Sequence, residues 1–363
     1  MKIAYCIEAF YNCGGMERVV SVKANWLAEH GHDVAILVAS QRGKATAFAL
    51  HPSITLVDLQ CNLHDLKSSY KMALAQHLGT NVYDIVVSTG GLELLFLWKF
   101  KDRSHKIVEF HFAWNRFFMM SNKSISKIKA VWQTMRQLYC AAKYERAVML
   151  THADKRFYQR FMSNTCVIPN PVTIKSGPTS NCTSKNAIAI GRLNYQKGFD
   201  LLIQSWKIVA AKHPDWQLNI YGDGQQRGGL STLIENEGLS NVVSLKGRAS
   251  DIKSKIIESS IHICSSRYEG FPLVIIETAS CGVPSVAFDC ITGPAEFIAD
   301  KVNGILVREV GDIKELANGI CTLIENDALR KEMSVKAHEM SIHFNIDEIM
   351  PKWEILFSSI TSQ

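Results

Sequence analysis

Short apolar runs alternate with amphipathic segments along almost the whole chain, and this alternation limits the possible folds more than any other feature. In the first half, MERVVSVKANWLAEHG is typical of a helix that ends at Gly31, and the runs typical of strands are KIAYCIEAF, DVAILVAS, DIVVSTGG, IVEFHF and RAVMLT. Strands that alternate with helices favour a parallel sheet with helices on both faces. The pattern therefore predicts the α/β class.

The alternation stops once and then begins again. Residues 173–186, TIKSGPTSNCTSKN, are rich in Ser, Thr, Asn, Gly and Pro, which is typical of a linker. Beyond it, helices are predicted at 199–212, near 229–237 and near 250–259, and strands at AIAIG, QLNIYGDG, VVSLKG, IHICSS, SVAFD and GILV. A chain of 363 residues also suits two domains. We predict two Rossmann-like domains, 1–170 and 171–345, that face each other across a cleft and bind ligands at the carboxyl ends of their strands.

The composition excludes several classes of protein. Apolar residues make up 47% of the chain and charged residues 20%, which is neither a fibrous nor a disordered composition. No run approaches the roughly 18 apolar residues of a membrane-spanning helix, and the N-terminal MKIAYCIEAF lacks a signal-peptide pattern. The 10 cysteines are scattered without a Cys-x-x-Cys pair, which favours reduced thiols and predicts no zinc site. We therefore expect a cytoplasmic protein.

One stretch of the second half, SRYEGFPLVIIETASCGVP at residues 266–284, places two carboxylates around an apolar helix. Pro272 is expected as the first helical residue, since its missing N–H costs nothing there. Glu269 would stand at the mouth of this helix and Glu277 five residues beyond the proline. The N–H groups expected to be free for an anion or sugar oxygens are those of Gly270, Phe271 and Leu273. The alternative is a buried core helix with a capping acid and an incidental glutamate.

Two loops at predicted strand ends could hold phosphate groups. GRLNYQKG places Arg192 and Lys197 five residues apart after the strand AIAIG, which suits a diphosphate. NCGGME places Gly14 and Gly15 after the first strand, where the backbone can approach a phosphate closely. The alternatives are a solvated basic loop and an ordinary turn. A dinucleotide-dependent oxidoreductase is disfavoured because no G-x-G-x-x-G follows the first strand.

Taken together, these motifs resemble retaining glycosyltransferase family 4, which has the GT-B fold, and in particular its bacterial enzymes of surface-polysaccharide synthesis. In the second half the resemblance rests on GRLNYQKG, YGDG, LKG, Glu269-x7-Glu277, CGVP, FDCITGPAEFI and NGILV in order. In the first half it is thinner and rests on Gly14-Gly15, the strand order and His111. By this resemblance, residues 346–363 would cross back to the first, acceptor-binding domain, and the second domain would bind the donor.

The resemblance also implies roles for the candidate residues. Arg192 and Lys197 would hold the donor diphosphate, and Glu269 and His111 would contact the donor sugar. Glu277 would bind the ribose hydroxyls, and the backbone of Gly247 and Arg248 would contact the edge of the base. The residues that would bind sugar and phosphate oxygens are Gly14, Gly15, Gly270, Phe271 and Leu273. The usual Glu-Gly-Phe-Gly loop reads Glu-Gly-Phe-Pro here, which removes one amide donor at position 272.

The expected reaction is the transfer of a hexose or N-acetylhexosamine from a nucleotide diphosphate sugar, UDP-linked by family frequency, to a glycan or lipid-linked saccharide. No Asp-x-Asp occurs in the chain, so a metal-independent reaction without a cofactor is expected. The family retains the anomeric configuration. The alternatives are a GT-B protein of another activity, such as a sugar-nucleotide epimerase, and a nucleotide-sugar-binding protein without turnover.

The charge of the chain is uneven and concentrates on one amphipathic segment. Residues 1–170 hold 21 lysines and arginines against 12 acidic residues, and residues 99–160 alone hold 14 against 4. In RFFMMSNKSISKIKAVWQTMRQLY, cations including Lys123, Lys127, Lys129 and Arg136 flank one predicted apolar face, made by Ile125, Ile128, Trp132 and Met135. This pattern predicts an interfacial helix on the anionic inner face of the cell membrane. The alternatives are an amphipathic helix packed on its own domain and, more weakly, a nucleic-acid site.

Overall fold

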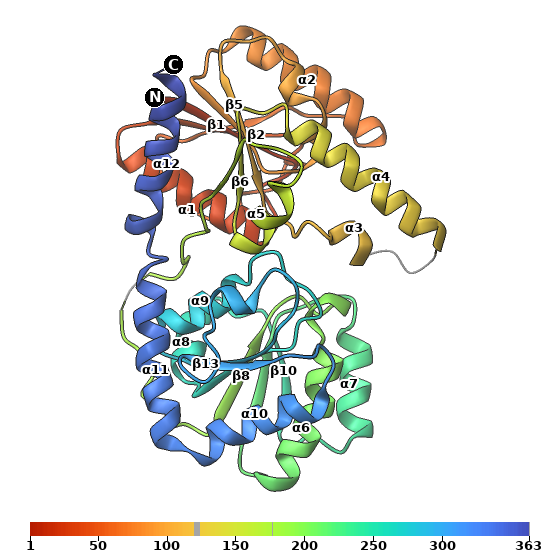
Figure 1. The fold of residues 1–363 in the computed structure, drawn as a ribbon, viewed down its shortest axis with the longest axis vertical. Helices are drawn as coiled ribbons and strands as arrows, with labels where there is room; N and C mark the ends of the chain where they lie inside the picture. The colour runs from red at the N-terminus through yellow and green to blue at the C-terminus, as the bar shows by residue number, and fades with distance from the viewer. Residues whose placement is uncertain (120–123, 176, 363) are drawn as a thin grey trace. The chain divides into compact units, whose positions relative to one another are not determined.

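The computed structural model describes residues 1–119, 124–175 and 177–362, and the chain divides into two compact units (Figure 1). The first unit is Met1–Thr173 together with Ile346–Gln363, and the second is Ile174–Asn345. The predicted boundaries, 170/171 and 345/346, lie within three residues of these. Within the described residues, none of the helices combines the length and the apolar character needed to cross a bilayer.

The first unit is built on one parallel sheet. Among its described residues, the strand order is β3-β2-β1-β4-β5-β6-β7. The strands are β1 (Lys2–Ile7), β2 (Asp33–Val38), β3 (Thr55–Asp58), β4 (Ile85–Ser88), β5 (His105–Phe110), β6 (Arg146–Met149) and β7 (Thr165–Val167). The helices are α1 (Gly15–Glu29), α2 (Leu66–Thr80), α3 (Arg116–Met119), α4 (Ser124–Ala141), α5 (His152–Tyr158) and α12 (Ile346–Thr361).

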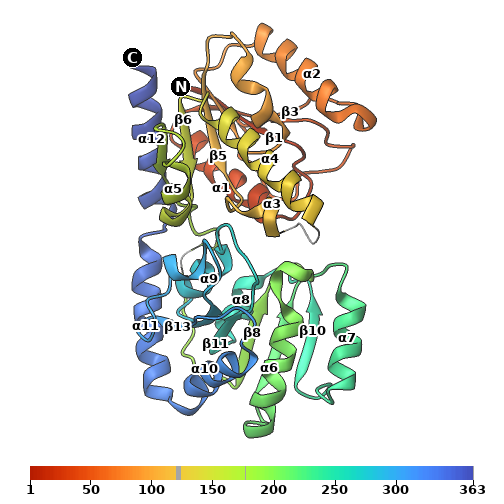
Figure 2. The ribbon, with the colours of Figure 1, turned by 45° about the vertical axis from the view of Figure 1, so that its right-hand side comes forward.

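Side-chain alternation along the strands gives this sheet two apolar faces. On β1, Ile3, Tyr5 and Ile7 pack on one face against α1 and α12, whereas Ala4 and Cys6 pack on the other against α2 and α4. α12 therefore belongs to the first unit although it ends the chain, and it runs beside α1 in both ribbon views (Figures 1 and 2). The sequence predicted that residues 346–363 return to the first domain, and the structure groups α12 with the first unit.

The second unit repeats the plan with a sheet in the order β10-β9-β8-β11-β12-β13, again parallel among its described residues. The strands are β8 (Asn186–Ile190), β9 (Gln217–Tyr221), β10 (Val243–Gly247), β11 (Ile261–Cys264), β12 (Ser285–Phe288) and β13 (Gly304–Val307). The helices are α6 (Phe199–Lys212), α7 (Arg227–Asn236), α8 (Ile252–Ile257), α9 (Leu273–Ser280), α10 (Ile313–Glu325) and α11 (Asp327–Ile342). The helix predicted at 199–212 has these bounds, and the α/β class is confirmed.

Candidate active site

The loops that follow β8 and β11 meet in the second unit because these strands are neighbours in the sheet. The strand order reverses between them, since β9 and β10 lie beyond β8 and β12 and β13 lie beyond β11. Ligands of open α/β sheets bind at such a reversal, outside the carboxyl ends of the strands. Arg192 and Lys197 stand in the first of these loops and Glu269 in the second.

The two loops are joined by an ion pair between Lys197 and Glu269. The ammonium of Lys197 donates to Oε1 of Glu269 over 2.7 Å, and the hydroxyl of Ser266 donates to the same oxygen. The two charged side chains are 20% and 6% exposed. Burial lowers the pKa of Lys197, but the carboxylate of Glu269 and the nearby Cys264 and Cys290 together raise it by more, so the net shift is upward. Lys197 is therefore a fixed positive charge beside a carboxylate that still has lone pairs for hydroxyl groups.

A second ion pair fixes the loop that carries Lys197. Arg267 donates to both carboxylate oxygens of Asp200 over 2.8 and 2.6 Å, and its guanidinium stacks on the ring of Tyr195 with 4.1 Å to the centroid. The N–H of Arg267 also donates to the carbonyl of Gln196 over 2.7 Å. Such a bidentate pair fixes orientation as well as distance. Arg267 thereby ties the loop after β11 to the short 3₁₀ turn Tyr195–Lys197.

Glycines allow the surrounding loops to approach each other closely. A Cβ atom on Gly198, whose φ is +62°, would lie 2.1 Å from the carbonyl oxygen of Ser265. A Cβ on Gly222 would lie 1.8 Å from the carbonyl oxygen of Gly191. A side chain at either position would force these loops apart. Arg192, next to Gly191, has an exposed side chain and is available to an anion.

The start of α9 differs from the expectation in two ways. Pro272 has ψ 74°, which is not helical, so the helix begins at Leu273 and not at the proline. The N–H of Leu273 is not free, because it donates to the carbonyl of Phe271 over 2.9 Å. The ring of Phe271 is buried against Phe297, with centroids 4.9 Å apart. Of the three amides expected to face a ligand, that of Leu273 is therefore engaged within the loop.

The two carboxylates of this segment are buried. Glu269 is 4% exposed and Glu277, inside α9, is 3% exposed.

The loop after β10 carries the candidates for the base contact. At the carboxyl end of this strand, Gly247 follows a register shift, has φ +73°, and accepts a 2.8 Å hydrogen bond from the N–H of Gly222. Arg248 comes next and is exposed. The loops after β8, β9 and β10 therefore lie next to one another along the carboxyl edge of the sheet.

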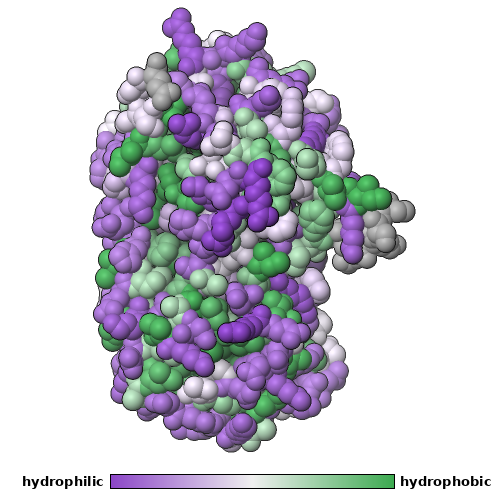
Figure 3. Space-filling view, in the orientation of Figure 1, coloured by the Kyte–Doolittle hydropathy of each residue, from purple (hydrophilic) through white to green (hydrophobic). Residues whose placement is uncertain are grey.

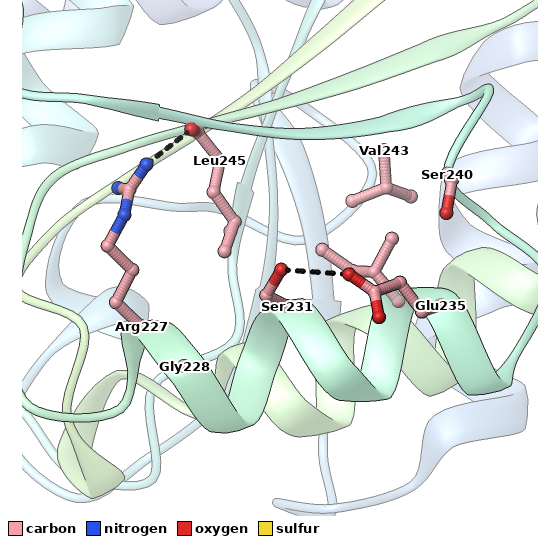
Figure 4. Close-up of a pocket in the computed structure, with 8 residues that line it drawn as sticks. Arg227, Gly228, Ser231, Glu235, Ser240, Val243 and Leu245 are labelled. Carbon is pink, nitrogen blue, oxygen red and sulfur yellow. Dashed lines mark hydrogen bonds between the residues drawn. The ribbon is translucent and has the colours of Figure 1, made fainter.

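A hollow on the second unit lies beside these loops, between α7 and the edge strand β10 (Figure 4). Arg227 closes one end of it by donating to the carbonyl of Leu245 over 3.1 Å, and Ser231 and Glu235 line the helix side. None of the predicted donor-binding residues lines this hollow. It is therefore not the candidate active site.

The first unit places its candidates at strand ends too. Gly14 precedes α1 and Gly15 is its first residue, so a glycine turn does lead into a helix. His111 directly follows β5, which is next to β4 in the sheet. Its side chain is 4% exposed, and its Nε2 lies 3.5 Å from Oε1 of Glu109.

Comparison with known proteins assigns the chain. Residues 13–176 match the model of the Glycosyltransferase Family 4 domain, and residues 173–340 match that of Glycosyl transferases group 1. The chain belongs to the family 4 glycosyltransferases and has the GT-B fold. It is 29% identical over 363 residues to an uncharacterized glycosyltransferase of Haemophilus influenzae, covering 97% of this chain and 99% of that protein. It is 27% identical to the amylovoran biosynthesis glycosyltransferase AmsD of Erwinia amylovora, covering 97% and 98%.

The fold assignment of this glycosyltransferase also rests on solved structures. A variant of S. aureus TarM, in complex with fondaparinux, α-GlcNAc-glycerol and UDP, superposes with a TM-score of 0.83 at 17% identity, covering 98% of this chain and 99% of that one. At this identity the likeness shows the fold alone. The predicted family and the predicted pair of parallel-sheet domains are confirmed.

The sequence did not reveal the pairing of Lys197 with Glu269, nor did it identify Arg267 and Asp200 as part of the glycosyltransferase site. The pairs Lys197–Glu269 and Arg267–Asp200 join residues 72 and 67 positions apart, and only the order of the strands brings them together. For Glu109 the sequence did carry one local signal. It stands two positions before His111, and residues i and i+2 of a strand point to the same face.

Among the described residues, one group of side chains could hold a metal ion: His213, Cys321 and Glu325. This group lies away from the donor loops, at the end of α6 and on α10.

Proposed function

We propose that this glycosyltransferase moves a hexose or N-acetylhexosamine from a UDP-sugar to a glycan or lipid-linked saccharide, with retention of configuration and without a metal ion. The observation that supports this most directly is the Lys197–Glu269 pair in the same loops as the exposed Arg192, at the carboxyl ends of the neighbouring strands β8 and β11. The UDP and the α-GlcNAc-glycerol bound in the TarM complex support the donor and the α product by analogy with a protein of the same fold.

In the proposed reaction, negative charge grows on the β-phosphate as the sugar leaves. Lys197, held in place by Glu269, and Arg192 stabilise this charge, which is the role that a metal ion has in enzymes with an Asp-x-Asp motif. Glu269 accepts hydrogen bonds from the sugar hydroxyls, and Glu277 accepts those of the ribose. The acceptor hydroxyl attacks from the face that the diphosphate leaves, and its proton passes to the departing phosphate. His111 contacts the donor sugar.

We further propose that α4 holds the enzyme on an anionic membrane surface, where a lipid-linked acceptor would be found. Its outward face carries five exposed large side chains at helical spacing: Ile128, Val131, Trp132, Met135 and Tyr139, each 49–73% exposed. Arg136 lies over the ring of Trp132 and Lys143 over that of Tyr139, at 5.2 Å each. Green and purple side chains are mixed over this part of the surface (Figure 3). Lys123 and the side chain of Ile125, which the sequence places on the same helix, lie outside the described residues.

An apolar face flanked by cations matches the headgroup boundary of a bilayer, since the rings enter the boundary and the cations remain at the anionic headgroups. The same helix packs its other side into the first unit, where Leu138 and Ala141 are buried. The alternative is that all apolar side chains of α4 pack against the first unit. That alternative does not account for the exposed rings of Trp132 and Tyr139.

The decisive experiment for the transferase assignment is a screen of the purified full chain against UDP-, dTDP- and GDP-linked sugars. We expect slow hydrolysis of one UDP-sugar that releases UDP and a free sugar, accelerated by a saccharide acceptor. The anomeric configuration of the first product, read by NMR before mutarotation, tests retention. An epimerised sugar nucleotide, or binding without release of UDP, would favour the alternatives and contradict the proposal.

A further inference from the structure

A fully buried ion pair lies behind His111 in the first unit. The ammonium of Lys23, on α1, donates to both carboxylate oxygens of Glu109, on β5, over 2.7 Å each. Both side chains are 0% exposed. Charged side chains are seldom buried so completely unless they are paired, and a buried pair is weak evidence for a role in stability, because apolar residues of similar volume often replace it without loss. The pair therefore calls for a functional explanation.

The surroundings of this pair contain aromatic rings and one imidazole. The ring of Trp353, from α12, lies 3.7 Å from the ammonium of Lys23, and that of Tyr5 lies 5.7 Å away. On the other side of Glu109, Nε2 of His111 is 3.5 Å from Oε1. This Nε2 is buried and makes no hydrogen bond among the described residues. Within that part of the chain, Glu109 is thus the acceptor near it, slightly beyond normal hydrogen-bond length.

Glu109 is ionised in this setting. Burial raises the pKa of its carboxyl, but Lys23 and His111 lower it by more, and the net result is a pKa of about 2. A carboxylate can only accept hydrogen bonds, so a hydrogen bond between the two groups needs the hydrogen on Nε2 of the imidazole. The Nδ1 atom of a neutral ring then keeps its lone pair.

We propose that Glu109, charge-balanced by Lys23, is a positioning residue that holds His111 in its Nε2–H tautomer and presents the Nδ1 lone pair to a hydroxyl of the donor sugar. This inference rests on the proposed function, because it assumes that His111 contacts the sugar. Glu109 itself touches no substrate. It acts through the orientation and the tautomer of the imidazole, as the partner of a catalytic histidine does in other enzymes.

The tautomer can be measured without any substrate. Long-range ¹H–¹⁵N NMR spectra distinguish Nε2–H from Nδ1–H imidazoles, and the signals of His111 are assigned by their loss in His111→Ala. At neutral pH we expect the wild-type ring as Nε2–H. In Glu109→Gln the amide oxygen should turn to Lys23 and the amide NH₂ to the imidazole, so the ring hydrogen should move to Nδ1. A wild-type ring in the Nδ1–H form, or no change in Glu109→Gln, would overturn the proposal.

A double-mutant cycle tests whether the effect on turnover passes through His111. We expect Glu109→Gln to lower kcat at least tenfold in the wild type and by less than twofold in the His111→Ala background. A structural role of Glu109 would lower kcat equally in both backgrounds and would refute the inference. If His111→Ala alone is fully active, the proposed contact of His111 with the sugar fails, whatever the NMR result.

The matched control is Lys106→Met. Lys106 lies near the start of β5, whereas Glu109 lies near its end. Lys106 forms a similar ion pair with Asp102 at 2.8 Å, with side chains 8% and 12% exposed. Its loss should lower the melting temperature and leave the tautomer of His111 unchanged. A shift of the His111 tautomer in this control as well would mean that any destabilisation produces it, and this result would count against Glu109.

Discussion

Replacing Trp353 by alanine should destabilise the first unit while leaving the second unit unchanged. Trp353 is completely buried on α12, where it packs against Phe357 with centroids 5.5 Å apart and covers the ammonium of Lys23 at 3.7 Å. Its neighbours in this apolar layer come from α1 and from the strands of the first unit. The substitution therefore removes a large ring from a core that only the end of the chain completes.

The expected magnitude follows from two contributions. A buried Trp→Ala change costs about 3–5 kcal/mol in lost contacts and cavity formation. The lost contact with the buried ammonium adds up to about 2 kcal/mol. A total of about 5 kcal/mol is a large part of the roughly 5–15 kcal/mol that stabilises a domain. For a unit of this size each kcal/mol lowers the melting temperature by about 2–4 °C, so we expect a decrease of roughly 10–20 °C.

Hydrogen exchange followed by mass spectrometry is the suitable assay because it separates the two units. Peptides from α1 and β5 should lose protection in Trp353→Ala, and peptides from 174–345 should not. Ile355→Ala is the control, since Ile355 lies on the same helix and is 70% exposed. A chain truncated after Asp347 should lose the fold of the first unit altogether. Unchanged protection of α1 in Trp353→Ala or in the truncated chain would refute the reasoning.

Three further predictions concern the donor site, the reaction and the membrane surface. Arg192→Ala and Glu277→Ala should each lower turnover at least tenfold with unchanged melting, because a charged hydrogen bond is worth about 1.5–3 kcal/mol; full activity in either would contradict the donor contacts. Turnover should survive dialysis into excess EDTA, and its loss with recovery on adding magnesium or manganese would contradict the metal-free reaction. In liposome flotation, binding should require anionic lipid, weaken at high salt and fall when Lys123, Lys127 and Lys129 become glutamate; equal binding to neutral vesicles would rule out the membrane proposal.

The sequence predicted those elements whose signal is strong and local. The central strands and the helix 199–212 have uninterrupted apolar patterns, and they appear where they were expected. The strands β3 and β7 were missed because they are short edge strands with half-buried side chains, so their patterns carry little apolar signal. The start of α9 was predicted at Pro272, one residue too early. The sequence alone does not show whether a proline is the first residue of a helix or the residue just before it.

The candidate site was predictable as a set of residues but not as a set of contacts. Glycines, cations and carboxylates at strand ends can be seen in the sequence, since the carboxyl edge of a parallel sheet collects its loops. Which of them touch depends on which strands are neighbours, and the alternation of strands and helices does not reveal that order. The contact of Lys197 with Glu269 and that of Lys23 with Glu109, 86 positions apart, therefore required the structure.

The return of α12 to the first unit affects how the chain can fold during synthesis. Residues 174–345 are continuous, so the second unit has all its elements before the last 18 residues exist. The first unit begins earlier, but the sheet face that α1 covers stays only partly covered until α12 emerges and supplies Trp353 and Phe357. The half that is synthesised first is thus completed last, and until then it exposes an apolar surface of the kind that chaperones bind and that aggregates form through.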